Sequence, residues 1–467
     1  MKHIACLLLI ALGFSAAAEP VKPNVVVIFT DDLGYRDLGC FGAPDIRTPR
    51  IDEMAREGMK FTEFYVASSI CSPSRAALLT GCYPELVGVD RVFFPNRGQG
   101  GLSPEQVTAA EVLRDAGYAT AAVGKWHLGD EPEFLPTNQG FDLYYGIPYS
   151  NDMFPAQTMA YAEDCLFREG VTPLDIQRAF ESETTRKNPR SMRNKVPLMR
   201  GEACIEFPAD QATLTRRYTD ETIRFIDESL AADRPFFVYL AHTMPHVPLF
   251  TTPEFKGKSR GGLYGDVIEE LDHETGRILD HLRELGIDKN TLVVFTSDNG
   301  PWLTRGDRAG SALPFFEGKF TRFEGGVRVP AVMWWPGTIP AGRTCGEPVM
   351  TIDLMPTVTR LAGGELPDRS VDGQDIFGLM TAQPEAQSPH EYLFFGPHAV
   401  RWGDWKYHAE ERFMVKETRR EETGPTLYHL GDDPGEALNV IQRQPEVAEK
   451  MARALAAHVE RIKSAGD

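Results

Sequence analysis

Short apolar runs alternate with amphipathic segments along most of this chain. Four runs have the length of buried strands: 24–30, 119–123, 236–240 and 292–296. Helical patterns lie between them, at 48–58, 214–230 and 267–286. This alternation predicts an α/β fold with one large, mostly parallel sheet that has helices on both faces.

Local signals mark several helix ends. Pro49 and Gly58 are the usual first and following residues of a helix. Ser103-Pro104-Glu105-Gln106 has the form of a capping box, so we expect it to open a helix that closes near Gly117.

The pattern changes at about residue 391. Short strand patterns separated by turn residues are expected at 392–395, 398–402, 405–408 and 426–429. An amphipathic helix is expected at 446–462. We therefore predict a main domain over 19–390 and a small antiparallel unit with one helix over 391–467.

The first eighteen residues have the features of a secretion signal. Lys2 and His3 precede a short apolar core, and Ala16-Ala17-Ala18 offers small residues for cleavage. An uncleaved signal anchor is the alternative, but it would not be expected to end in small residues that suit cleavage. No segment of the chain approaches the roughly 18 apolar residues that a membrane span needs. The chain has no Asn-x-Ser/Thr sequon. We expect an exported protein, periplasmic or secreted, from a bacterial source.

Composition narrows the class of partner. The 467 residues are 42% hydrophobic and 25% charged, as in a globular protein with a sizeable core. The formal net charge of −18 argues against nucleic-acid binding, which requires a basic surface. An anionic substrate would therefore need local positive charge at its site.

Each of the four apolar strands is followed by polar side chains. These are Asp31 and Asp32, Lys125 and His127, His242, and Asp298 and Asn299. Asp and Asn are also common turn residues, so one such cluster means little. Because ligands bind beyond the carboxyl ends of strands in open α/β sheets, four together predict an active-site edge.

Two of these clusters offer only oxygen ligands. Asp31, Asp32, Asp298 and Asn299 supply three carboxylates and one amide, which suit Ca²⁺ or Mg²⁺ better than zinc. Metal binding and turn formation are about equally compatible with these residues taken alone.

The stretch from Ile70 to Pro84 carries the most specific pattern. Pro73 fits the first turn of a helix, which places Cys71 at a helix N-terminus, and Arg75 adds a fixed positive charge. Cys71 could be a buried structural thiol. A phosphatase-type thiolate nucleophile would need a longer loop between Cys71 and Arg75.

Cys71-Ser72-Pro73-Ser74-Arg75, with the run on to Gly81, resembles the Cys-x-Pro-Ser-Arg signature of type I sulfatases of the arylsulfatase A and N-acetylgalactosamine-6-sulfatase kind, in the alkaline phosphatase superfamily. The resemblance implies that a formylglycine-generating enzyme oxidises Cys71 to formylglycine, whose hydrate is the nucleophile. An arginine usually follows the Thr-Gly pair in this family, and Cys82 stands there instead.

The resemblance extends to other motifs and implies roles for their residues. Gly124-Lys125-Trp126-His127-Leu128-Gly129 and the segment around Lys319 are similar to family patterns. Lys125, His242, Lys319 and Ser150 are implied to contact sulfate, and His127 to contact formylglycine. Residues 31, 32, 71, 298 and 299 are implied to hold one divalent ion, usually calcium. His246, Glu324 and Arg328 are expected to be structural.

The implied reaction is hydrolysis of the S–O bond of a sulfate monoester. Arg75, Lys125 and Lys319 would neutralise the sulfate, and His242, with Lys319, would protonate the leaving alcohol. A sulfated carbohydrate is favoured over an aryl sulfate as substrate. The alternatives are a phosphate or phosphonate ester hydrolase of the same superfamily, and a sulfated-glycan binder without activity if Cys71 stays unconverted.

The segment from Tyr149 to Leu214 shows little periodicity. It contains six basic residues and no acids over 186–200: Arg186, Lys187, Arg190, Arg193, Lys195 and Arg200. These form either a solvated loop or a rim for a polyanionic sugar, and Phe93, Phe94 and Tyr149 could line the same entrance. Cys165 and Cys204 are a candidate disulfide.

Overall fold

The structure is a computed structural model that describes residues 22–182, 189–410, 413–414 and 424–466. The predicted signal segment lies outside these residues. Among the helices that are described, none combines the length and the apolar character needed to cross a membrane.

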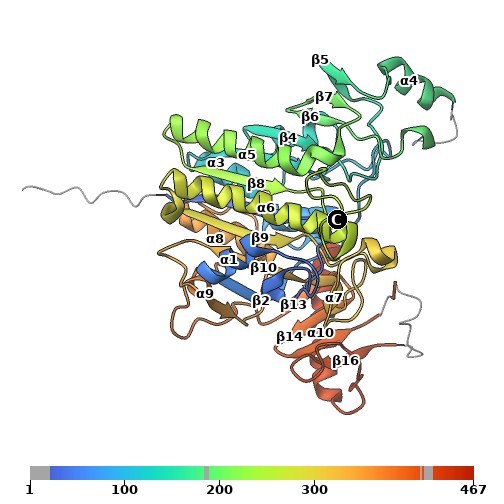
Figure 1. The fold of residues 1–467 in the computed structure, drawn as a ribbon. Coiled ribbons are helices and arrows are strands. Elements are labelled where there is room, and N and C mark those ends of the chain that lie inside the picture. The colour runs from blue at the N-terminus through green and yellow to red at the C-terminus, as the bar shows by residue number, and fades with distance from the viewer. Residues whose placement is uncertain (1–21, 183–188, 411–412, 415–423, 467) are drawn as a thin grey trace, which may run out of the picture.

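A twelve-stranded sheet forms the centre of the molecule (Figure 1). Its middle is parallel, because β1 (Asn24–Thr30) pairs in parallel with both β8 (Phe236–Ala241) and β9 (Thr291–Ser297). β3 (Ala119–Lys125) pairs in parallel with β8 and with β4 (Leu143–Ile147). The four predicted strands are thus confirmed as neighbours at the centre of the sheet.

Further strands complete the two sides of the sheet. One side adds β10 (Arg328–Trp334), β2 (Met59–Tyr65), β11 (Arg343–Cys345) and β12 (Val349–Met350). The other adds β6 (Leu198–Arg200), β7 (Ala203–Phe207) and β5 (Ala160–Phe167). β10 runs antiparallel to β9, so the sheet is mixed but mostly parallel.

Helices cover both faces of the sheet, as predicted. α1 (Pro49–Glu57), α5 (Leu214–Ala231) and α6 (Gly262–Glu284) share one apolar core with the sheet. α2 (Cys71–Thr80), α3 (Ala109–Asp115) and α8 (Leu354–Leu361) share the core on the opposite face. The shorter helices α4 (Pro173–Ser182), α7 (Glu324–Val327) and α9 (Phe377–Met380) lie in the connections.

The helix predicted from Ser103 begins later than expected. α3 starts after Thr108, whose hydroxyl accepts from the backbone N–H of Glu111, while the Glu111 carboxylate accepts from the Thr108 N–H. Thr108 and Glu111 thus form the capping box that the helix uses. Ser103 closes only a turn, in which its carbonyl accepts from the N–H of Gln106.

The C-terminal part forms a separate antiparallel sheet of four strands, β13 (Leu393–Phe395), β14 (Ala399–Trp402), β15 (Trp405–His408) and β16 (Thr426–His429). α10 (Pro445–Gly466) packs on this sheet and adds Met451 and Leu455 to a small core of its own. The small sheet and its helix match the prediction, and the domain boundary at residue 391 stays a prediction.

The weakly periodic segment after Tyr149 adds short strands and α4 to one end of the large sheet (Figure 1). Lys195 pairs with Glu169 and Arg200 with Glu221, so two of its basic residues are neutralised locally. Arg186 and Lys187 lie outside the described residues. The Sγ atoms of Cys165 and Cys204 are 3.9 Å apart on paired strands, and both residues are free thiols, so the structure does not contain the disulfide suggested for them.

Candidate active site

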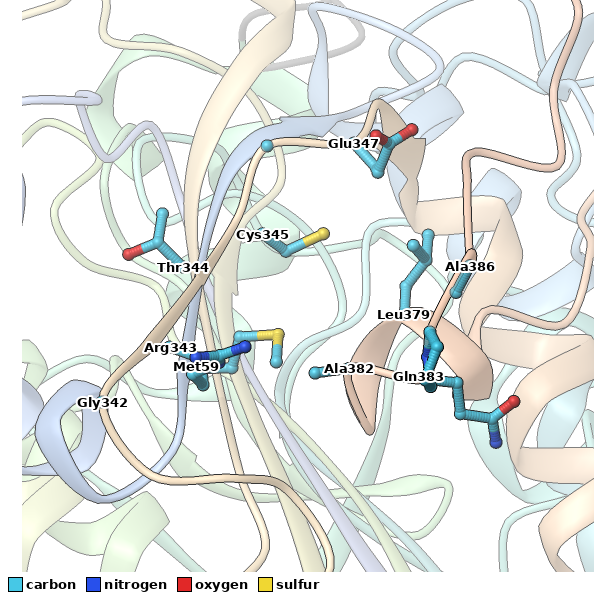
Figure 2. Close-up of a pocket in the computed structure, with 12 residues that line it drawn as sticks. Met59, Gly342, Arg343, Thr344, Cys345, Glu347, Leu379, Ala382, Gln383 and Ala386 are labelled. Carbon is cyan, nitrogen blue, oxygen red and sulfur yellow. The ribbon is translucent and has the colours of Figure 1, made fainter.

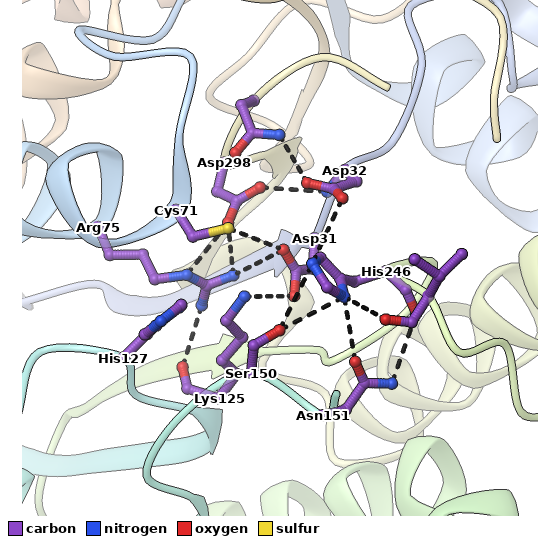
Figure 3. Close-up of polar contacts among 12 residues, drawn as sticks. Asp31, Asp32, Cys71, Arg75, Lys125, His127, Ser150, Asn151, His246 and Asp298 are labelled. Carbon is purple, nitrogen blue, oxygen red and sulfur yellow. Dashed lines mark hydrogen bonds and ion pairs between the residues drawn. The ribbon is translucent and has the colours of Figure 1, made fainter. Parts of the chain in front are cut away.

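Side chains from the carboxyl ends of β1, β3 and β9 meet the N-terminus of α2 in one buried cluster (Figure 3). The parallel strands bring Asp31, Lys125 and Asp298 to the same edge although they are far apart in the sequence. The residues predicted from the ends of β1, β3 and β9 therefore lie together, and their catalytic role stays a prediction.

Cys71 is the first residue of α2 and is only 2% exposed. Its thiol donates to Oδ1 of Asp31 at 3.6 Å, and Nζ of Lys319 donates to Sγ at 3.2 Å. Burial raises the pKa of this thiol to about 12, although Lys125 and Lys319 act in the opposite direction. The unmodified residue is a neutral thiol at physiological pH, which argues against a phosphatase-type thiolate.

Arg75 lies one helical turn further along α2 and is completely buried. Its Nε and Nη2 donate to Oδ2 of Asp298 at 3.1 and 2.7 Å, and Nη1 donates to the carbonyl oxygen of Lys125 at 3.0 Å. Burial opposes the charge, but Asp298 together with Asp31 and other neighbours outweighs it, so the pKa of Arg75 is raised. The guanidinium therefore ties α2 to β3 and β9 and stays charged.

Two lysines pair with the two aspartates that follow β1. Nζ of Lys125 lies 2.6 Å from Oδ2 of Asp31, and Nζ of Lys319 lies 2.6 Å from Oδ1 of Asp32. Burial opposes ionisation of Asp31, yet Lys125, with smaller effects of other cations, lowers its pKa. Burial also opposes the charge of Lys319, but Asp32, together with Asp31 and Asp298, more than offsets it, so the pKa of Lys319 is raised. Both pairs are ionic.

The four oxygen-bearing residues predicted to hold a metal converge. The backbone N–H of Asp32 donates to Oδ1 of Asp298 at 3.1 Å, and Nδ2 of Asn299 donates to Oδ1 of Asp32 at 2.7 Å. Oδ2 of Asp32 and Oδ1 of Asn299 are buried and accept no hydrogen bond from any described residue. Unpaired buried oxygens beside carboxylates fit a hard divalent cation.

Ligand atoms of Asp31, Cys71 and Asp298 lie within 4.8 Å of one another, as do those of Asp32, Cys71 and His246. Asp32 has a φ of 69°, an unusual value for a residue other than glycine. Strained backbone of this kind persists where the surrounding structure requires it, as at a ligand site.

His127 follows β3 and also has a positive φ, 62°. Its Nε2 donates to the carbonyl oxygen of Phe93 at 3.1 Å, and the ring of Tyr149 lies edge-on at 5.9 Å. Burial, helped by Lys125 and Arg75, holds the pKa of His127 well below its usual range. His127 is therefore a neutral imidazole beside Arg75 and Lys125 (Figure 3).

His242 does not join this cluster. Its backbone N–H continues the sheet by donating to the Phe29 carbonyl oxygen, and its ring lies 6.3 Å from the ring of Tyr218 on α5. Neither ring nitrogen has a hydrogen-bond partner among the described residues. Burial alone lowers the pKa of His242 to about 3. The placement expected for His242 is wrong.

His246, which was expected to be structural, occupies the cluster instead (Figure 3). Its Nε2 lies 3.7 Å from Oδ2 of Asp32, and its Nδ1 donates to the carbonyl oxygen of Val247 at 2.7 Å. Ser150 Oγ is 3.4 Å from the same ring, and Oδ1 of Asn151 is 3.1 Å from Nδ1. Burial, together with Lys319, lowers the pKa of His246.

Strand alternation could have separated the two histidines. Phe236, Val238 and Leu240 face the core under α5 and α6. His242 continues this two-residue period and must point the same way, away from the α2 face. His246 lies beyond the strand, where the chain is free to turn across the sheet edge.

A pocket of about 540 Å³ lies elsewhere, beside the sheet-edge strand β11 (Figure 2). Cys345, Glu347, Met59 and Gln383 are among its lining residues. It holds none of the residues of the cluster around Cys71, so it does not compete as a catalytic centre.

Comparison with known proteins fits this geometry. The family model described as Sulfatase matches residues 23–364. The chain belongs to the sulfatase family. A second family model, described as N-sulphoglucosamine sulphohydrolase, C-terminal, matches residues 313–464.

Relatives cover nearly the whole chain. Human arylsulfatase A is 38% identical over 93% of this chain and 86% of the relative, and canine N-acetylgalactosamine-6-sulfatase is 36% identical over 96% and 89%. Among solved structures, the PsFucS1 sulfatase from Pseudoalteromonas sp. is 28% identical with a TM-score of 0.80, covering 95% of this chain and 91% of that one.

The family membership predicted from the motifs is thus confirmed. The enzyme class is confirmed as well, since the relatives are sulfuric ester hydrolases, and this sulfatase hydrolyses sulfate esters. The roles of single residues stay predictions.

Proposed function

We propose that this sulfatase removes sulfate from a sulfated carbohydrate, using formylglycine formed from Cys71 and one bound divalent cation. The observation that carries the proposal is the position of Cys71, at a helix N-terminus between Lys319 and the carboxylate of Asp31. A carbohydrate is supported by relatives, because one is an N-acetylgalactosamine-6-sulfatase and a structural neighbour, 29% identical with a TM-score of 0.75, was solved with k-i-k-neocarrahexaose.

The chain's own groups can bind and orient a sulfate ester. Lys125, Lys319 and Ser150 lie around Cys71 and can contact the sulfate oxygens. Arg75 holds Asp298 and the end of β3 in place and adds positive charge. Fixed charges in a buried site stabilise developing negative charge far better than they would in water.

Asp31, Asp32, Asp298 and Asn299 would hold the cation, which we take to be Ca²⁺, with Mg²⁺ as the alternative. The two unpaired oxygens of Asp32 and Asn299 support this set. The ion would supply further positive charge to the sulfate oxygens.

Conversion of Cys71 by a formylglycine-generating enzyme would supply the nucleophile as an aldehyde hydrate. The neutral, buried thiol cannot take that part itself. Proton transfer to the leaving alcohol falls to His246, in place of His242, with Lys319 beside it. Because Nδ1 of His246 donates to a backbone carbonyl, Nε2 carries no proton in the neutral ring, and it would first take one up from solvent and then pass it to the leaving oxygen. His127 would assist release of sulfate.

The experiment is the mass of the peptide containing Cys71, combined with sulfate release from p-nitrophenyl sulfate. Protein made with a formylglycine-generating enzyme should lose one sulfur and two hydrogens and gain one oxygen at Cys71, and should hydrolyse the ester. Cys71→Ala should abolish activity. An active protein with unconverted cysteine would contradict the mechanism, and an unconverted, inactive protein would favour a glycan-binding role.

Substrate class and location need their own measurements. Phosphate release from p-nitrophenyl phosphate at a rate equal to sulfate release would favour the superfamily alternative. Among sulfated sugars, a panel of monosaccharide sulfates should show one preferred sulfate position. The predicted signal segment supports export to the periplasm or beyond, which fractionation of the producing cell would test.

A further inference from the structure

A buried network of charged side chains joins the C-terminal sheet to the segment that carries Lys319. Its members, called here the Glu324 clamp, are Glu324 at the start of α7, Lys406 and His408 on β15, and Glu436 after β16. The side chains of all four are at most 1% exposed.

The carboxylate of Glu324 is held from both parts of the molecule. From the large sheet, Tyr65 Oη donates to Oε2 at 2.6 Å and Nη1 of Arg328 donates at 3.2 Å. From the C-terminal sheet, Nζ of Lys406 donates to Oε1 at 2.7 Å. Burial opposes ionisation of Glu324, but Lys406 and the arginines lower its pKa to about 2. The carboxylate is therefore charged and fully paired.

Glu436 holds the backbone at the same point. Its Oε2 accepts from the N–H of Glu324 at 2.6 Å. Its Oε1 accepts from Nε2 of His408 at 2.8 Å and lies 3.5 Å from Nζ of Lys406. The C-terminal sheet thus fixes both the side chain and the main chain of Glu324.

Lys319 stands five residues before Glu324, in a tightly folded loop. Phe320 has a φ of 74°, and the N–H of Gly325 bonds back to the Phe316 carbonyl oxygen. A Cβ at Gly325 would lie 2.1 Å from the carbonyl oxygen of Glu317, so the loop has no slack on that side. A shift of Glu324 would therefore move the loop and, with it, Lys319.

We propose that the Glu324 clamp positions Lys319 against Cys71 and the substrate, so that the C-terminal sheet is part of the catalytic apparatus. Lys406, His408 and Glu436 are positioning residues, since Lys406 and Glu436 contact Glu324 and His408 contacts Glu436, and none of the three contacts Cys71 or Lys319. The inference rests on the proposed function through the role of Lys319 at the sulfate. Buried ion pairs add little net stability, whereas they do fix geometry, which agrees with a positioning role.

Two variants test the clamp, with one control. Lys406→Met removes the cation from Glu324, and Glu436→Gln keeps an acceptor but removes its charge. A third variant, Lys406→Arg, keeps the positive charge beside Glu324 and should therefore retain part of the sulfate binding that Lys406→Met loses. His390→Gln is the control, because it breaks another buried pair, His390 with Asp353 at 2.7 Å, in a different part of the molecule.

The readouts are KM for p-nitrophenyl sulfate, Ki for inorganic sulfate, and hydrogen–deuterium exchange of the peptide spanning 316–328. Both clamp variants should raise KM and Ki by about ten-fold or more, because a misplaced cation binds sulfate poorly. They should also speed exchange in that peptide, with conversion of Cys71 unchanged. His390→Gln should lower the melting temperature without changing Ki or this exchange.

If exchange of the 316–328 peptide is faster but Ki for sulfate is unchanged, the clamp has only a structural role. If exchange of this peptide is unchanged, the clamp does not hold the Lys319 loop and the proposal is wrong. If Lys406→Met does not fold, Glu436→Gln decides alone. Hydrogen–deuterium exchange does not depend on turnover. A native protein that is converted at Cys71 but inactive would refute the proposed function, and exchange would still show whether the clamp holds the loop that carries Lys319.

Discussion

The two histidines that follow β8 allow a matched test of the site. His246→Ala removes a ring that contacts Ser150 and lies 3.7 Å from Asp32. His242→Phe replaces a ring that has no hydrogen-bond partner among the described residues, in the core beside Tyr218. The two substitutions are four positions apart, and only His246→Ala should lower kcat.

The magnitudes follow from these contacts. Loss of a group that transfers a proton to the leaving alcohol costs about 100-fold to 10,000-fold in kcat. We therefore expect His246→Ala to lower kcat at least 100-fold, which is roughly 2.7 kcal/mol of activation free energy. His242→Phe removes two buried nitrogens that have no partner, so it should keep kcat within about three-fold and leave the free energy of unfolding unchanged or raised by about 1 kcal/mol.

The assay is steady-state hydrolysis of p-nitrophenyl sulfate by protein with the same converted fraction at Cys71. Urea unfolding of each variant gives the free energy of unfolding. A poor aryl leaving group should widen the effect of His246→Ala, since protonation matters more there. Equal losses of kcat in both variants, or a larger loss in His242→Phe, would refute the placement of the two histidines.

Three further predictions concern conversion, metal and pH. Cys82→Arg restores the family arginine and should increase conversion of Cys71, which peptide mass would show. The substitution also brings a second guanidinium beside Arg369, whose Nη1 lies 2.6 Å from the Cys82 sulfur. It should therefore lower the free energy of unfolding by about 1–3 kcal/mol, which urea unfolding would show. Chelation with EDTA should abolish activity and lower the melting temperature, because three buried carboxylates lose their cation, and added Ca²⁺ should restore both. Burial raises the pKa of Asp37 from 3.8 to about 6, so the folded state favours the protonated carboxyl. The stability that this protonated group contributes is complete below about pH 4 and is lost as the pH rises through about 6. Between about pH 4 and 7 the free energy of unfolding of Asp37→Asn should therefore rise by about 3 kcal/mol relative to that of the native protein. Curves of unfolding free energy against pH that run parallel for the two proteins would contradict this.

The central strands and the start of α2 could be predicted because each is specified by its own residues. Asn24–Thr30 is buried throughout and its residues 25–29 are all apolar, and Pro73 marks the first turn that begins at Cys71. The approach of Asp31, Lys125 and Asp298 follows from parallel pairing, which brings strand ends to one edge.

Other features depend on partners that are distant in the sequence. Ser103 and Thr108 both begin capping-box patterns, and the fold uses the second. In the sequence, Glu324 and Lys406 resemble ordinary solvated charges. Each can be buried only because it pairs with the other, and the sequence does not show this pairing. The strands between 160 and 207 lie at one end of the sheet, where no residue of β5 is buried and β6 has only three residues, so their apolar patterns are weak.

The burial of Cys71 makes maturation a matter of timing. A residue that is 2% exposed, under Arg75 and Lys319, offers no access to a second enzyme once the chain has folded. Under the proposed mechanism, conversion would then compete with folding as the chain is made, and each molecule that folds first would stay unconverted and inactive. The specific activity of a preparation would report how fast the converting enzyme was during synthesis, and adding that enzyme to the purified, folded protein would not raise it.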